Sequence, residues 1–163
     1  PISTRMKEQM DYLLDPFCLI TVIALNIDEY RKHPEKICGP MGLNRSRLDE
    51  ILNKLHAAGF ISFDAQANPQ DRIRLTKTRF HFGPDHPLMR AHQLALRSHS
   101  VSHLMKVSES DNQSMMVTFS ADAETFDHVQ REIKETLQRA EKHVSRAKSR
   151  SVYQLNIDLF KWF

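Results

Sequence analysis

The sequence predicts a helix-rich α+β fold, in which a winged helix-turn-helix is followed by a helix and a strand–long helix–strand (βαβ) module. Between residues 33 and 79, two helical patterns separated by a glycine are followed by two short alternating segments. Near the C-terminus, a long amphipathic pattern lies between two further alternating segments. These patterns predict a winged helix-turn-helix domain over residues 13–80 and a C-terminal α/β module for dimerisation or sensing over residues 81–163.

The first helix is predicted from its cap. Residues 1–12 are mixed and polar, as in a lead-in helix or a linker. Asp15 can cap a helix, and Pro16 suits the first turn because its missing N–H has no helical partner there. The apolar residues that follow predict a helix over residues 17–29 that is buried on nearly every side.

A short second helix is expected to begin at His33-Pro34. Pro40 removes a helical hydrogen bond, so we expect this helix to end near Gly39. Gly42 then supplies the turn.

Asn44 is expected to cap a third helix, which runs to about Ala58 before Gly59 ends it in a left-handed conformation. Leu48, Ile51, Leu52 and Leu55 form its apolar stripe. Residues 60–63 and 72–75 alternate between apolar and polar side chains and predict two half-buried strands. The polar loop between them is interpreted as the wing.

The C-terminal module is predicted to contain a helix over residues 87–107, strands over 114–120 and 151–159, and a helix from Asp122 to about Lys148. A strand–helix–strand order predicts two parallel strands with a right-handed connection. Two strands alone are rarely stable in water, so a further segment or a second subunit must complete the sheet. We therefore expect a homodimer, which suits the two-fold symmetry of DNA sites.

Positive charge gathers on the predicted winged helix. Residues 44–79 hold seven Lys and Arg against four Asp and Glu, a net charge of +3 that equals the net charge of the whole chain. Such an excess suits a phosphate backbone, although a solvated basic surface is the alternative.

In a winged helix, the third helix enters the major groove and the wing contacts the backbone or the minor groove. Double-stranded DNA is therefore the expected partner. A protein-protein adaptor that does not bind DNA is the alternative, because Asp49 and Glu50 on the same helix repel phosphate. The candidate DNA contacts are Asn44, Arg45, Ser46, Arg47, Asn53, Arg72 and Arg74.

Other chemistries are not indicated. The sequence has no glycine-rich phosphate loop, nucleophile elbow or paired-carboxylate motif, so we expect neither catalytic residues nor a cofactor. His99 and His103 could share one metal ion, but no cysteine or carboxylate cluster nearby completes four ligands, and no metal site is expected. Gln154, Asn156 and Trp162 are candidate ligand or interface residues.

The expected location is the cytoplasm. The two cysteines, Cys18 and Cys38, are predicted to be buried, reduced thiols. The sequence contains no run of about 18 apolar residues, so no membrane span is expected. The chain opens at Pro1 without a methionine or a signal peptide, which is consistent with a missing upstream part.

Motifs spread over the chain carry a resemblance. The closing motif Val152-Tyr153-Gln154-Leu155-Asn156-Ile157 is the most specific, and the others are Asp15-Pro16-Phe17, Pro34-Glu35-x-Ile37, Leu55-x-x-x-Gly59-Phe60-Ile61 and a helix with His92 followed by a strand at residues 115–120. Over residues 15–163 they resemble an uncharacterised family of bacterial proteins described as transcription regulators. The resemblance implies a winged helix, a C-terminal module of unknown role and no catalytic residues. This sequence departs from the family at Pro40 and at Ala91.

Overall fold

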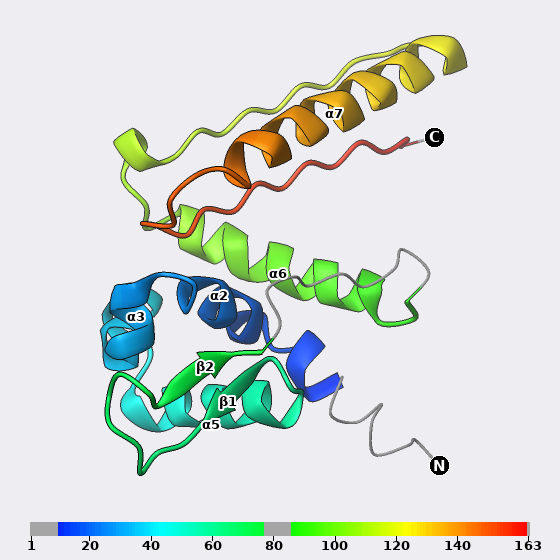
Figure 1. The fold of residues 1–163 in the computed structure, drawn as a ribbon. Helices are drawn as coiled ribbons and strands as arrows, with labels where there is room; N and C mark the ends of the chain where they lie inside the picture. Colours follow the sequence, from blue (N-terminus) through cyan, green and yellow to red (C-terminus); the bar gives the residue numbers. More distant parts are fainter. Residues whose placement is uncertain (1–9, 77–85, 163) are drawn as a thin grey trace. The chain divides into compact units, whose positions relative to one another are not determined.

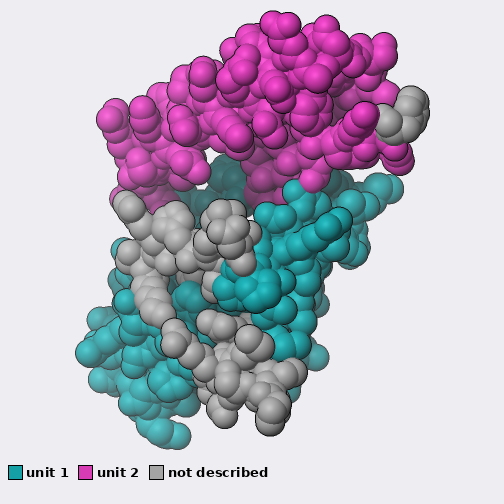
Figure 2. Space-filling model, turned by 90° about the vertical axis from the view of Figure 1, so that its right-hand side faces the viewer, with its two compact units in different colours: residues 1–106, 150–153 teal, residues 107–149, 154–163 magenta. Residues whose placement is uncertain are grey.

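The computed structural model describes residues 10–76 and 86–162 (Figure 1). These residues form a helix-rich structure with one two-stranded antiparallel sheet, which confirms the α+β class. The chain divides into two compact units (Figure 2): unit 1 holds residues 1–106 and 150–153, and unit 2 holds residues 107–149 and 154–163. The expected division between residues 80 and 81 thus falls inside unit 1, in a segment that lies outside the described residues.

The N-terminal residues belong to the core rather than to a linker. Residues 10–13 are helical, and the side chains of Tyr12 and Leu13 are fully buried. The Tyr12 ring packs on Phe60 with 4.4 Å between the ring centroids. The core of unit 1 therefore begins before residue 13.

Two helices replace the single helix predicted over residues 17–29. Helix α2 spans Pro16–Ala24 and α3 spans Asp28–Lys32. The Asn26 side chain donates to two carbonyl groups near the end of α2, at 3.1 and 3.3 Å, and so stabilises the turn that separates the helices. The expectation of burial on nearly every side was also wrong, because the Ile23 side chain is exposed.

The short second helix forms, but it does not end near Gly39. A 3-10 turn at Pro34–Ile37 (η1) continues into α4 at Cys38–Met41. Pro40 is the third residue of α4, so its missing N–H falls in the first turn of that helix rather than in the interior of a long one. Gly42 makes the predicted turn with a left-handed φ of 63°.

The third helix and the hairpin confirm the sequence prediction. Helix α5 spans Arg45–Ala57, and the Asn44 side chain caps it by accepting a hydrogen bond at 2.8 Å. Gly59 follows with a left-handed φ of 72°. Strands β1 (Ile61–Phe63) and β2 (Ile73–Leu75) pair antiparallel, in contact with α5 and α3 respectively.

Helix α6, Met89–Leu104, packs against α2 and belongs to unit 1. His92 is buried, and its Nδ1 atom lies 2.6 Å from the Leu13 carbonyl oxygen, which accepts a hydrogen bond. The His99 ring meets Phe17 edge to face at 4.5 Å. These contacts explain why unit 1 extends beyond residue 80.

Unit 2 is built around α7, Ala123–Val144, whose N-terminus is capped by Asp122 as predicted. The helix ends at Val144 rather than near Lys148. The prediction of strands over residues 114–120 and 151–159 was wrong. Within the described residues, neither segment pairs with a neighbour in a sheet. Figure 1 shows both segments drawn out on either side of α7. The β1–β2 pair is supported by packing on α5 and α3, whereas two strands without such support or a further partner are marginal in water.

We predict that Thr21→Val stabilises the protein. The Thr21 side chain is fully buried, and its hydroxyl group has no hydrogen-bond partner among the described residues. Replacing the hydroxyl by a methyl group of similar size should raise the free energy of unfolding by about 1 kcal/mol in chemical denaturation. Val22→Thr, at the adjacent and equally buried position, should lower it by at least as much. A clear loss of stability in Thr21→Val would show that the hydroxyl is partnered.

Candidate nucleic-acid interface

The outward face of α5 is polar. Leu48, Ile51, Leu52 and Leu55 are fully buried, which fixes the rotation of the helix. Ser46, Glu50 and Asn53 are exposed, and their spacings of four and three residues put them on one helical face. This face therefore offers hydrogen-bonding groups and no large apolar side chain.

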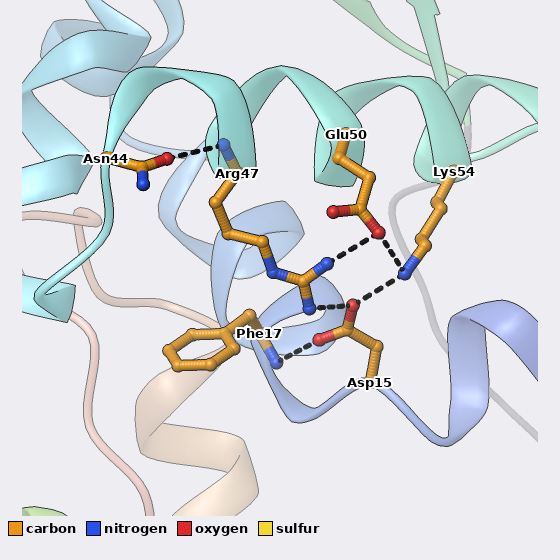
Figure 3. A network of polar contacts seen from close by, with 6 residues as sticks. All are labelled: Asp15, Phe17, Asn44, Arg47, Glu50 and Lys54. Atoms are coloured by element: carbon orange, nitrogen blue, oxygen red, sulfur yellow. Dashed lines mark hydrogen bonds and ion pairs between the residues drawn. The ribbon is translucent and has the colours of Figure 1, made fainter.

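A buried carboxylate joins α2 to α5 (Figure 3). The Asp15 side chain is only 6% exposed. Its Oδ1 atom accepts from the Phe17 backbone N–H at 3.2 Å and so caps α2, as predicted. Its Oδ2 atom accepts from Arg47 at 2.5 Å and from Lys54 at 2.9 Å, both on α5.

Glu50, which is exposed to solvent, pairs with the same two cations, Arg47 and Lys54. One of its carboxylate oxygens lies 2.6 Å from Arg47 and 2.9 Å from Lys54. Asp15, Arg47, Glu50 and Lys54 thus form a ring of four alternating charges, which we call the α2–α5 charge ring. Its two cations and two anions carry no net charge.

The ring favours the charged forms of Glu50 and Arg47. Hydrogen bonds from Arg47 and then from Lys54 lower the pKa of Glu50 to about 2. The hydrogen bond to Glu50 raises the pKa of Arg47.

The two cysteines lie outside the ring. Burial raises the pKa of Cys18 to about 12, with a further contribution from the Asp15 charge. Cys18 therefore remains a neutral thiol. Cys38 is also free, but it is only half-buried.

The structure separates the seven predicted DNA contacts into two groups. Asn44, Arg45, Ser46, Asn53 and Arg74 are exposed. Arg47 is instead turned toward Asp15 as a member of the charge ring, and Arg72 is half-buried with an Nε atom that has no hydrogen-bond partner among the described residues.

Most cations near α5 and the hairpin are paired. Of the eight Lys and Arg residues between positions 31 and 74, six form ion pairs within the described residues. Arg45, for example, lies 3.1 Å from Asp49, and Arg74 lies 3.4 Å from Asp71. Residues 10–76 hold these eight cations against nine Asp and Glu, a net charge of −1. The excess predicted for residues 44–79 includes Lys77 and Arg79, which lie outside the described residues.

One cation beside the hairpin loop has no ion pair among the described residues. Lys32, at the end of α3, is exposed and lines an open depression of about 440 Å³ together with His33 and residues 68–71 of the loop. This depression is open to solvent and its lining includes both Lys32 and Asp71, so it is not an enclosed ligand site.

The C-terminal candidates are exposed. The Gln154 side chain donates to Asn156 at 3.1 Å. The Trp162 ring packs on Phe160 with 5.1 Å between the ring centroids, and 77% of the Trp162 surface is exposed.

Within residues 10–76 and 86–162, no group of three or more His, Cys, Asp or Glu could hold a metal ion. No helix in these two ranges is long and apolar enough to cross a membrane.

Sequence reasoning missed the charge ring. Arg47, Glu50 and Lys54 are spaced by three and four residues, which is enough to predict a ladder of ion pairs along one side of the helix. Asp15 lies 32 residues before Arg47, and its second role depends on the packing of α2 against α5, which the local pattern does not specify.

We predict that Asp15→Asn lowers the free energy of unfolding by about 2 kcal/mol, because it leaves two partly buried cations without their anion and weakens the cap of α2. Chemical denaturation checks this value. Asp49→Asn removes the same charge from an exposed pair with Arg45, and it should cost less than about 0.5 kcal/mol. Equal losses in the two variants would contradict a structural role for the charge ring.

Comparison with known proteins gives a family but no function. No curated protein and no solved structure matches the chain. A family model described as a domain of unknown function, DUF4423, matches residues 5–161. The chain therefore belongs to the DUF4423 family.

Proposed function

We propose that this protein is a DNA-binding transcription regulator whose unit 1 is a winged helix-turn-helix. In this interpretation α4, the Gly42 turn and α5 form the helix-turn-helix, and the β1–β2 hairpin is the wing. The observation that carries the proposal is the exposed polar face of α5 beside a hairpin that bears the exposed Arg74. The resemblance to bacterial regulators supports the same function.

Ser46 and Asn53 on this face, and Arg45 at the start of the helix, carry groups that suit DNA. The Asn53 amide can form two hydrogen bonds with adenine, and the Ser46 hydroxyl can bond a base or a phosphate. Arg45 is half exposed, and its ion pair with Asp49 is weak enough to be exchanged for a phosphate. Arg47 is assigned to support the helix instead, because Asp15 holds it from a buried position.

A second candidate is a winged-helix adaptor that binds protein and not DNA. The specific observation in its favour is the pairing of six of the eight cations between residues 31 and 74. A surface whose cations are already paired with anions exerts only a weak long-range attraction on a polyanion such as DNA. The two functions differ in whether any duplex is bound at low salt.

We predict that the protein selects related sequences from a pool of random duplexes of about 25 base pairs, because each good base contact contributes about 1–3 kcal/mol. Ser46→Ala with Asn53→Ala removes the hydrogen-bonding groups from the α5 face. This variant should lose the sequence preference and keep weak, salt-sensitive binding. Mobility shift and sequencing of the retained duplexes measure both properties.

The matched control is Ser98→Ala with Gln93→Ala, which removes one hydroxyl and one amide from exposed positions on α6. It should select the same sequences as the wild type. If the wild type retains no duplex at about 50 mM salt, DNA binding is wrong and the adaptor function is supported.

We further propose that the protein is a cytoplasmic homodimer held together through unit 2. Large apolar side chains are exposed along both segments that flank α7, among them Met116 at 91%, Val117 at 79% and Leu155 at 68%. Such apolar surface is typical of an interface rather than of an isolated domain. A second copy fits this role because unpaired segments with alternating side chains can complete a sheet with their own equivalents.

We predict a light-scattering mass of twice the 19.0 kDa of one chain. Leu155→Asp should weaken the dimer about a thousandfold, because each of two copies loses about 2 kcal/mol of apolar burial. Val101→Asp changes a similarly exposed residue, at 64%, on α6 of unit 1 and should leave the dimer intact. Dissociation by Val101→Asp alone would place the interface on α6 and contradict a dimer held by unit 2.

A further inference from the structure

Exposed positive charge is concentrated at the C-terminal end of α7. Residues 142–149 contain Lys142, Arg146 and Lys148 and no acidic residue. All three side chains are exposed, and none has an ion pair among the described residues. We call these three residues the basic end of α7. All belong to unit 2.

Ordinary structural roles do not account for this charge. A helix C-terminus favours cations only within its last turn, which explains Lys142. Arg146 and Lys148 lie beyond Val144, where α7 ends. The residues three and four positions away from Lys142 are Gln138, Arg139, Ser145 and Arg146, which include no acid to pair with it.

Two earlier cations of the same helix, Arg131 and Arg139, have acidic residues four positions away. Arg139 pairs with Glu135, four residues before it, at 3.9 Å. Arg131 has Asp127 and Glu135 at the corresponding positions on either side. Lys134 is a single cation without an acid three or four positions away, whereas the basic end gathers three such cations within residues 142–148.

We propose that the basic end of α7 binds the phosphate backbone of double-stranded DNA, independently of sequence. Uncompensated, solvated cations bind DNA by releasing condensed counterions, and they carry no base readout. Arg146 can donate two parallel hydrogen bonds to one phosphate, and the lysines act as point charges. This inference rests on the proposed function, and it assigns to unit 2 the electrostatic contribution that the paired cations of α5 do not supply.

The test compares two double variants of the full chain that lose the same charge. Arg146→Gln with Lys148→Gln changes the basic end, and Arg131→Gln with Arg139→Gln is the matched control on the same helix. Binding to a random duplex of about 25 base pairs is measured by fluorescence anisotropy from about 50 to 200 mM salt.

The plot of log affinity against log salt should lose about 1.8 units of slope in the first variant, or about 0.9 for each phosphate contact. Affinity at about 100 mM salt should fall roughly tenfold, and the sequences selected from a random pool should not change. The control variant should lose less than about 0.5 units of slope.

Equal slopes in the two variants, with duplex binding otherwise intact, would overturn the inference and leave the proposed function standing. Failure of the wild type to bind any duplex would overturn both. Vesicles with about 30% anionic lipid provide the last comparison. Binding to vesicles that depends on Arg146 and Lys148, without an effect on DNA, would assign the basic end to a membrane surface and reject the DNA contact.

Discussion

The placement of α5 depends on one buried carboxylate. Asp15 caps α2 with one oxygen and accepts from two cations of α5 with the other. Burying an ion usually costs more than its pairing returns, unless its hydrogen bonds are satisfied. Here both oxygens have partners, and Glu50 satisfies the same cations from the solvent side. The ring therefore adds a polar constraint on the rotation of α5 to the one that its buried apolar side chains provide.

That constraint also determines which α5 residues are available to a partner. Arg47 and Lys54 point toward Asp15 at the start of α2 (Figure 3). Ser46 and Asn53 are exposed. A face of this kind suits hydrogen-bonded readout better than electrostatic attraction. Specificity and electrostatic affinity are separate contributions to DNA binding, and under the proposed function different surfaces of this protein carry them.

The sequence predicted those elements whose cause is local. The Asn44 cap, the left-handed Gly42 and Gly59, and the alternating residues of β1 and β2 all depend on neighbours within a few positions. The break between α2 and α3 was missed because it depends on one side chain, Asn26, inside an apolar run. The position of Arg47 was missed because its partner, Asp15, is brought near only by tertiary packing.

The two C-terminal strands were wrong for a different reason. Both segments do alternate in sequence, but the exposed side chains of Val117 and Leu155 show that nothing within the described part of one chain covers the apolar faces. An alternating segment becomes a strand only when a neighbour supplies backbone partners. A local pattern can therefore specify which face of a segment is apolar without specifying which molecule will cover it. The same reasoning applies to the basic end of α7, where Arg146 and Lys148 lack any acidic neighbour. Apolar surface without cover and charge without compensation both occur in unit 2, and this is why both the proposed dimer and the proposed backbone contact are assigned to it.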